Sequence, residues 1–320
     1  MQLPDHPSVG QALMALQSQG LDRLDAQLLL LHVLDVAPTQ RGWLLAHDTD
    51  LLPAASLPRL QALAERRTQG EPLAYLTGSK AFYGLNLQVS ADVLVPRPDT
   101  ETLVDWALEV LHCQRPAPHQ AATSAVLPAS AAPPSVGGGS APCCVLDLGT
   151  GSGAIALALK ANRPDLQVWA SDMSSAALTV AQANAQRLGL QVQFAQGAWL
   201  AALPPDAPLF DCIVANPPYI ATGDTHLPAL RFEPAQALTS GADGLDDLRQ
   251  IICQAPAHLL PGGWLLLEHG YDQAAAVQQL LTQQGFISVQ SRLDLAGQTR
   301  CTGGQKAALT LSTPSPSASP

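Results

Sequence analysis

From residue 144 onward the sequence alternates short apolar segments with longer amphipathic ones, and this alternation restricts the fold more than any other feature. The strand-like segments are CVLDL (144–148), QVWASD (167–172), LQVQFAQG (190–197), LFDCIVANPPY (209–219) and GWLLLEHG (263–270). The helix-like segments are 153–163, 174–189, 243–260 and 272–285, and two further strands are expected within 286–312. Strands that alternate with helices predict an α/β fold, Rossmann-like, with a mostly parallel seven-stranded sheet covered on both faces. The final strand pair predicts an antiparallel edge.

The rest of the chain divides by composition and periodicity. Residues 8–69 read as amphipathic helices, with leucines every three to four residues at Leu21, Leu24, Leu28 and Leu31 and with Ser56 as an N-cap. Residues 82–95 alternate as a hairpin with its turn at 90–92, and Asp99 or Thr100 is expected to cap the helix that follows. The predicted units are a small helical domain (1–81), the hairpin and connecting helix (82–113), a Pro/Ala/Ser/Gly-rich low-complexity insertion (114–142), the α/β domain (143–311) and a disordered tail (312–320).

Charge and cysteine content exclude several classes of function. The chain has 26 acidic and 16 basic residues and a formal net charge of −10, which argues against direct binding to nucleic acid. The six cysteines form no CxxC pair, and none stands at zinc-ligand spacing from a histidine, so no metal site is expected. The sequence shows no targeting signal and no apolar run of membrane-spanning length. We therefore expect no membrane association and a cytoplasmic location.

The segment VLDLGTGSGAIALAL (145–159) predicts a cofactor loop between a strand and a helix. Gly149, Gly151 and Gly153 permit a tight turn and close approach of a ligand to the backbone. The spacing is GxGxG, whereas the dinucleotide fingerprint is GxGxxG, and Asp147 would repel a pyrophosphate. An acid at this point suits a ligand with a cationic amino-acid end. The loop therefore favours S-adenosyl-L-methionine over NAD.

Two later residues extend the predicted cofactor site. Asp172 ends the next strand, where an acid can accept hydrogen bonds from ribose hydroxyls; the alternative is that it caps the helix after it. Trp199 follows the third strand and could lie against an adenine ring, although core packing is the usual role of a single tryptophan.

The stretch Asn216-Pro217-Pro218-Tyr219 predicts the reacting centre. Two prolines at a strand end give a stiff corner with no competing N–H groups. Asn216 Oδ1 and a backbone carbonyl, expected to be that of Pro217, can accept both hydrogens of an –NH₂ group and stabilise positive charge on its nitrogen. Tyr219 offers a flat face for a planar amide or base. The alternative is a Pro-Pro turn packed by a tyrosine, but the glycine loop 67 residues upstream favours methyl transfer to a planar amine.

Together these residues resemble the class I S-adenosylmethionine-dependent methyltransferases, and more closely the HemK/PrmC family of peptide chain release factor N5-glutamine methyltransferases. The resemblance rests on GEPLAYLTGSKAFYG (70–84), VLVPRPDTETLV (93–104), VLDLGTGSGAIALAL (145–159), IVANPPYI (213–220), RFEPAQALTSGADGLDDLR (231–249) and LLLEHG (265–270). It implies methylation of the glutamine in the Gly-Gly-Gln loop of class 1 release factors, with the N-terminal helices helping to dock that partner.

Carried over by position, the resemblance implies a set of site residues. The cofactor would contact Gly149, Thr150, Gly151, Ser152, Gly153, Asp172, Trp199 and Asn216. The substrate amide would be held by Asn216, Pro217, Pro218 and Tyr219. Relatives often read Asp-Trp where this chain has Ala198-Trp199, so an acid contact to the adenine amine is missing here or supplied elsewhere.

Several alternatives remain open at this point. An adenine-N6 methyltransferase acting on DNA or RNA would use the same acceptors and stack its base on Tyr219, although acting on a duplex requires base flipping. An inactive binding scaffold and an NAD dehydrogenase fit the glycine loop less well. Arg97 and Glu233 could border the glutamine pocket or only pin their loops through a salt bridge. Neighbouring strand residues face opposite sides, so Glu268 is expected near the cofactor and His269 in a structural role.

Overall fold

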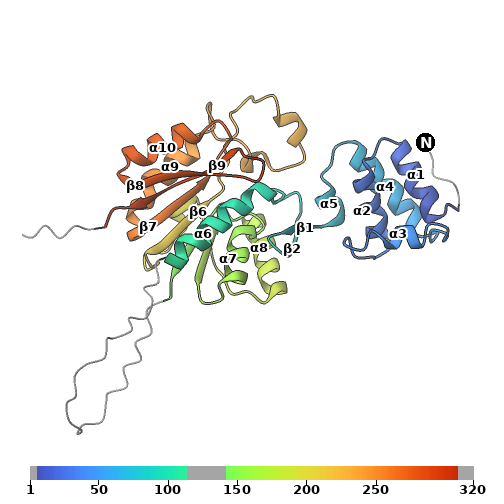
Figure 1. Cartoon of the computed structure of the whole chain (residues 1–320), viewed down its shortest axis with the longest axis horizontal. Helices are drawn as coiled ribbons and strands as arrows, with labels where there is room; N and C mark the ends of the chain where they lie inside the picture. Colours follow the sequence, from blue (N-terminus) through green and yellow to red (C-terminus); the bar gives the residue numbers. More distant parts are fainter. Residues whose placement is uncertain (1–5, 114–141, 309–320) are drawn as a thin grey trace, which may run out of the picture.

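The seven-stranded sheet predicted from the sequence forms the centre of the part of the molecule that follows the N-terminal helices (Figure 1). The structure, a computed structural model, describes residues 6–113 and 142–308. The sheet order is β5-β4-β3-β6-β7-β9-β8, and β9 runs antiparallel to both of its neighbours. The strands are β3 (Cys144–Leu148), β4 (Gln167–Asp172), β5 (Gln193–Gln196), β6 (Phe210–Ala215), β7 (Leu259–Glu268), β8 (Phe286–Leu293) and β9 (Thr299–Lys306). The parallel sheet and its antiparallel edge are thus both confirmed.

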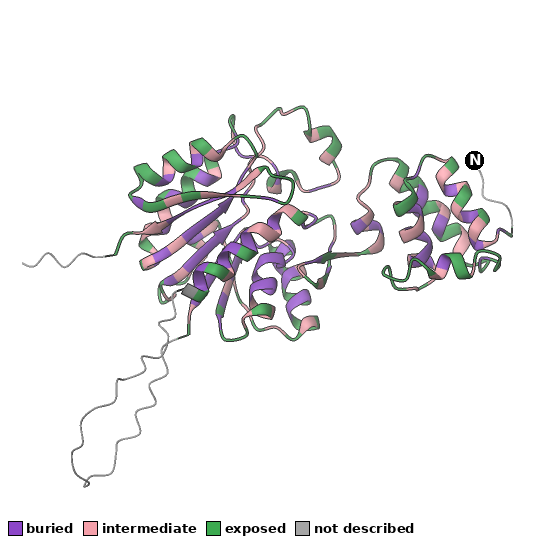
Figure 2. Cartoon of the chain, in the orientation of Figure 1, coloured by how far each residue is buried: buried purple, intermediate pink, exposed green. Residues whose placement is uncertain are grey.

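Helices cover both faces of this sheet, because successive strand residues point to opposite sides. Val145 belongs to the core packed under α6 and α7, whereas its neighbour Leu146 belongs to the core packed under α9 and α10. Figure 2 shows the central strands buried between these two layers. The helices are α6 (Glu101–Cys113), α7 (Ala154–Asn162), α8 (Ser175–Leu188), α9 (Asp246–Gln254) and α10 (Ala274–Gln283).

The strand order places the carboxyl ends of β3, β4 and β6 beside one another. From β3 the chain moves outward to β4 and β5, then crosses back to β6 on the other side of β3. This confirms the expectation that the NPPY strand lies next to the strand of the glycine loop. Ligands of open α/β sheets bind at such a switch point.

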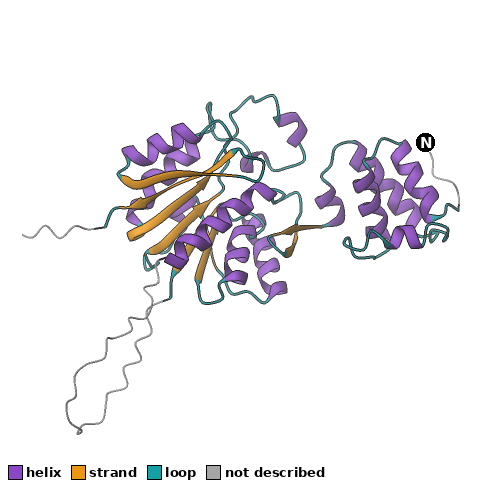
Figure 3. Ribbon diagram, viewed as in Figure 1, coloured by secondary structure: helices purple, strands orange, loops and turns teal. Residues whose placement is uncertain are grey.

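The N-terminal helices pack around a core of their own, beside the sheet (Figure 3). They are α1 (Val9–Ser18), α2 (Arg23–Val33), α3 (Trp43–Ala46), α4 (Ser56–Thr68) and α5 (Leu73–Thr77). Leu29, Leu30 and Leu31 are fully buried, whereas Leu24 of the expected leucine stripe is 43% exposed. Ser56 does not cap α4 through its side chain: it is the first helical residue, and its hydroxyl donates to the carbonyl of Val33 on α2.

The predicted turn of the hairpin is wrong. The strands are β1 (Ser79–Phe82) and β2 (Leu85–Gln88), joined at Tyr83 and Gly84, which both have positive φ (47° and 77°). A two-residue turn of this kind matches the twist of paired strands, but tyrosine seldom adopts it, so the sequence signal is weak. Val93 and Val95 do not return as a strand; they are buried with Ala177 of α8.

Some sequence predictions fall partly or wholly outside the described residues. Residues 114–141 of the predicted low-complexity insertion and all of the predicted tail (312–320) belong to this group. Within residues 6–113 and 142–308, no helix combines the length and the hydropathy that a membrane span requires. The same residues contain no cluster of three or more His, Cys, Asp or Glu suited to a metal ion.

Candidate active site

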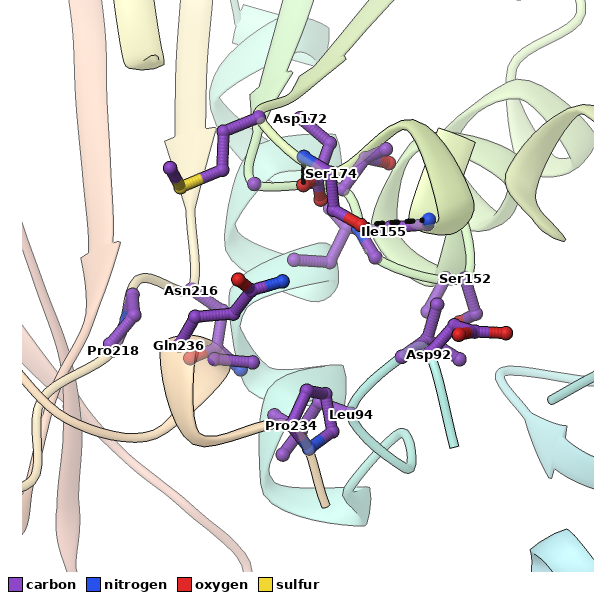
Figure 4. A pocket seen from close by; sticks show the side chains of 18 of the residues that line it. Asp92, Leu94, Ser152, Ile155, Asp172, Ser174, Asn216, Pro218, Pro234 and Gln236 are labelled. Carbon is purple, nitrogen blue, oxygen red and sulfur yellow. Dashed lines mark hydrogen bonds between the residues drawn. The ribbon is translucent and has the colours of Figure 1, made fainter. Parts of the chain in front are cut away.

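A cavity of about 320 Å³ opens at the carboxyl ends of β3, β4 and β6, a volume suited to a small organic ligand. Figure 4 shows that its walls come from segments far apart in the sequence. The labelled side chains are Asp92, Leu94, Ser152, Ile155, Asp172, Ser174, Asn216, Pro218, Pro234 and Gln236.

The glycine loop forms one wall of this cavity. Gly149, Gly151 and Gly153 all have positive φ (69°, 55° and 82°), a conformation that other residues rarely adopt. Gly149 through Ser152 line the cavity, whereas Gly153 lies behind the lining. A Cβ on Gly153 would lie 2.9 Å from Leu157 Cδ1, so the loop approaches α7 at a distance that only glycine allows.

We expect Gly153→Ala to lower the free energy of unfolding by about 1–3 kcal/mol, because alanine would be strained at this φ and would press on Leu157. Urea denaturation of both proteins measures the difference. Gly42→Ala is the matched control, since Gly42 has φ −61° and open space around it. Equal effects of the two substitutions would contradict the packing role of Gly153.

Asp147 lies beneath the glycine loop. It is fully buried; its Oδ2 accepts hydrogen bonds from Thr150 Oγ1 (2.7 Å) and from the N–H of Ala156 (3.1 Å). Burial raises the pKa of Asp147 to about 7, and these two hydrogen bonds oppose the rise. Within the described part of the chain, Oδ1 has no hydrogen-bond partner. The carboxyl group therefore supports the loop and is not part of the cavity lining.

Asp172 lines the cavity and also holds the loop. Its Oδ2 accepts from the N–H of Gly151, and its Oδ1 accepts from the N–H of Ser174, both at 2.9 Å. The alternative role as cap of α8 is wrong, since the N-cap is Ser174, whose hydroxyl accepts from the N–H of Ala177. Burial raises the pKa of Asp172, while its backbone hydrogen bonds favour the ionised form. Because Asp172 lines the cavity, a ligand hydroxyl bound there could reach its carboxylate.

Trp199 lies against the glycine loop and lines the cavity. A Cβ on Gly149 would be 3.1 Å from Trp199 Cζ3, so the loop and the indole are in close contact. The indole N–H donates to Asp247 Oδ1 at 3.1 Å. Asp247, on α9, and Ala198 line the same cavity. The carboxylate of Asp247 therefore lies near Ala198, the position at which relatives often carry an aspartate.

The NPPY corner separates this cavity from a second one of about 360 Å³. Asn216 lines both cavities, Pro218 lines the first, and Pro217 and Tyr219 line the second. Arg97 also lines both. Asn216 thus stands where two ligands could meet.

Hydrogen bonds from beneath fix both ends of the corner. Asn216 Nδ2 donates to Thr100 Oγ1 at 3.2 Å, and Tyr219 Oη donates to Glu268 Oε1 at 3.4 Å. Thr100, predicted as a possible helix cap, lies in a 3-10 turn (Pro98–Thr100) that continues into α6. Because Nδ2 is used by Thr100, Asn216 Oδ1 is the acceptor that remains for a ligand.

The structure also shows what the other candidate residues contact. Arg97 pairs with Glu233 at 2.5 Å, and Glu233 is buried and accepts from the N–H of Val95, so the salt bridge does pin two loops. Glu268 is buried behind Tyr219 and is not part of the cavity lining. His269 is buried and contacts Thr302 and the carbonyl of Gly270, which confirms its structural role.

Several lining residues were not identified from the sequence. Asp92 and Ser174 carried only turn or cap signals, and Pro234 and Gln236 stand in a loop with no periodic pattern. Thr100 could be found only through its contact with Asn216. No local signal marks these residues as part of a cavity lining, because tertiary packing brings their segments to the cavity.

Comparison with known proteins agrees with this geometry. Two family models match: the PrmC N-terminal domain over residues 10–78 and the methyltransferase small domain over residues 141–284. A protein of Bordetella pertussis (strain Tohama I) named release factor glutamine methyltransferase is 47% identical over 291 residues, which is 90% of this chain and 97% of that protein. A protein of the same name from Burkholderia pseudomallei (strain K96243) is 45% identical, covering 93% of this chain and 97% of that protein.

A solved structure supports the fold independently. The catalytic domain of hMettl16, crystallised with MAT2A 3′UTR hairpin 1, superposes with a TM-score of 0.52 over 82% of this chain and 84% of that chain. The sequence identity is 14%, so this likeness concerns the fold alone. It is the fold of a class I methyltransferase.

Proposed function

Because the chain belongs to the release factor glutamine methyltransferase family, we propose that it transfers a methyl group from S-adenosyl-L-methionine to the side-chain amide nitrogen of the Gly-Gly-Gln glutamine. The observation that carries the proposal is the position of Asn216 on the boundary of two cavities, one walled by the glycine loop and one by Pro217 and Tyr219. A methyl donor in the first cavity and a planar amide in the second would meet at this boundary.

The residues of the first cavity fit the proposed cofactor. Gly149 through Ser152 line the cavity, a Cβ on Gly151 would stand in open space, and Asp172 offers a carboxylate for ribose hydroxyls. Trp199 offers its ring to the adenine, and we assign to Asp247 the acid contact to the adenine amine. Asp147 and Gly153 would not line the cavity themselves but would hold the glycine loop in the conformation that contacts the cofactor. When bound, S-adenosyl-L-methionine supplies an activated methyl group on a sulfonium that is its own leaving group.

The residues of the NPPY corner would position the amide. Asn216 Oδ1 and the carbonyl of Pro217 would accept the two amide hydrogens, fixing the nitrogen and stabilising the positive charge that builds on it. Pro218 would keep the corner stiff, and Tyr219 would stack on the amide plane. Burial, with Glu268 nearby, raises the pKa of Tyr219 above its ordinary value, so the phenol stays neutral near pH 7. Proton loss to solvent completes the reaction.

The partner and location follow from this proposal. We assign residues 1–81 to docking of the release factor and residues 143–311 to methyl transfer. The last turns of α4 lie beside the loop that follows the NPPY corner, where Arg231 donates to the carbonyl of Gln69. Through this contact, a release factor bound to the N-terminal helices would lie close to the proposed catalytic corner. A cytoplasmic location agrees with a substrate that acts in translation termination.

The test is a methylation assay of the purified chain with methyl-labelled cofactor. The candidate acceptors are a class 1 release factor, the same factor with the motif glutamine replaced by alanine, DNA and RNA. We expect label on the intact release factor alone. Label on adenine, with none on the Gly-Gly-Gln glutamine, would replace the proposal with the adenine alternative.

A further inference from the structure

A fully buried asparagine joins the glycine loop to the β1–β2 hairpin. Asn184 lies on α8, which passes beside β2 (Figure 1), and it is not part of either cavity lining. Its Nδ2 donates to the carbonyls of Ser152 (3.0 Å) and Gln88 (2.9 Å). Its Oδ1 accepts from the N–H of Gln88 at 2.7 Å. One side chain therefore holds both the last residue of β2 and a residue in the wall of the first cavity.

The orientation of the Asn184 amide is fixed by its partners. A backbone N–H can only donate and a backbone carbonyl can only accept. A flipped amide would bring its NH₂ group to the N–H of Gln88 and its oxygen to the two carbonyls. Arg187 Nη2 also donates to Oδ1, at 3.1 Å, so both acceptor positions and both donor positions of the amide are filled. The hairpin thus holds Asn184 with its Nδ2 toward the glycine loop.

The peptide between Ser152 and Gly153 depends on this contact for its orientation. The three glycines leave the backbone of the loop conformationally free, so ordering it costs more free energy than ordering other residues. The N–H of Gly153 donates to the carbonyl of Thr150, and Asn184 donates to the carbonyl of Ser152, so both polar groups of this peptide are held. Without Asn184, binding of a ligand would itself have to order the peptide, which lowers affinity.

We infer that Asn184 is a positioning residue for the cofactor, because it holds the glycine loop in one conformation while the hairpin holds Asn184. This inference rests on the proposed binding of S-adenosyl-L-methionine in the first cavity. Asn184 is buried behind the lining, so its effect on binding passes through the carbonyl of Ser152. The hairpin is thereby part of the support of the cofactor site.

The test is a calorimetric titration of the full chain with S-adenosyl-L-methionine, without a release factor. Asn184→Ala removes the whole amide. Asn184→Asp keeps an acceptor for the N–H of Gln88 but has no NH₂ group for the carbonyl of Ser152. Both variants should weaken cofactor binding about tenfold, the upper range for one hydrogen bond.

Two further measurements distinguish positioning from a purely structural role. Hydrogen exchange of the loop amides in the cofactor-free chain should be faster in both Asn184 variants than in the parent protein, because the loop would open more often. In the methylation assay, KM for the cofactor should rise about tenfold in both variants. Their kcat at saturating cofactor should stay within about threefold of the parent value, because the bound cofactor orders the loop.

Two controls separate positioning from a general loss of stability. Leu281→Ala leaves a cavity in the core under α10, where Leu281 is fully buried and lines neither cavity. Asn162→Asp makes the same chemical change at the last residue of α7, where Asn162 is exposed and its Nδ2 donates to the carbonyl of Ala158. Both controls should bind the cofactor within about twofold of the parent protein. Urea denaturation ranks the stabilities and confirms that each variant is folded.

Each contrary result has a separate meaning. Cofactor binding at parental strength by Asn184→Ala or by Asn184→Asp would overturn the inference. An equal loss of affinity in Leu281→Ala would overturn it as well, because lower stability alone would then explain the effect. A parent protein that does not bind S-adenosyl-L-methionine would instead refute the proposed cofactor.

Discussion

Asn216→Ala is expected to lower kcat for release factor methylation by roughly 100-fold, the usual cost of removing one preorganised group that stabilises charge in a transition state. Alanine removes the acceptor that orients the amide hydrogens, and an amide nitrogen is a poor nucleophile unless its geometry is fixed. Because Asn216 lies just after the end of β6 and its Nδ2 donates a hydrogen bond to Thr100 Oγ1, the fold should survive the change. Initial rates with methyl-labelled cofactor measure kcat, and urea denaturation measures stability.

Asn86→Ala is the matched control for this substitution. Asn86 is exposed on β2, and Arg187 contacts its backbone carbonyl, not its side chain. Its replacement should leave kcat and stability near the parent values. If Asn216→Ala keeps kcat within about threefold of the parent, Asn216 Oδ1 is not a catalytic acceptor.

Asp172→Ala is expected to weaken binding of S-adenosyl-L-methionine by roughly 10- to 100-fold, because a hydrogen bond to a charged group contributes about 1.5–3 kcal/mol. Two effects combine. The ribose hydroxyls lose a carboxylate acceptor, and the N–H of Gly151 loses the acceptor that holds the glycine loop in shape. Isothermal titration calorimetry of the chain with the cofactor measures the dissociation constant. Turnover at saturating cofactor should fall much less, since Asp172 lies away from the NPPY corner.

Asp206→Ala serves as the control, since Asp206 is an exposed aspartate in the loop before β6. It should bind the cofactor as the parent does. Unchanged binding by Asp172→Ala would mean that its carboxylate only supports the loop. A large loss of stability with unchanged binding would point to the same conclusion.

Much of the architecture could be predicted because it depends on local patterns. Alternating strand and helix segments predicted the parallel sheet, and the position of β6 beside β3 followed from the usual chain reversal at a switch point. The hairpin turn was missed, because Tyr83 adopts a positive φ that its identity does not suggest. The predicted cap at Ser56 was wrong, because the Ser56 hydroxyl donates to the carbonyl of Val33 on another helix. Both errors arose where tertiary contacts decided a local conformation.

The sequence alone determined the glycine loop and the Pro-Pro corner, since both are encoded by neighbouring residues whose backbone conformations are unusually free or unusually restricted. Tertiary structure alone decided what supports them. Asp147 is placed beneath the loop and not in the cavity, and Thr100 reaches Asn216 from 116 residues away. Glu268 reaches Tyr219 across 49 residues. The physical reason is that buried polar groups must find partners, and which segments supply them is settled only when the core packs.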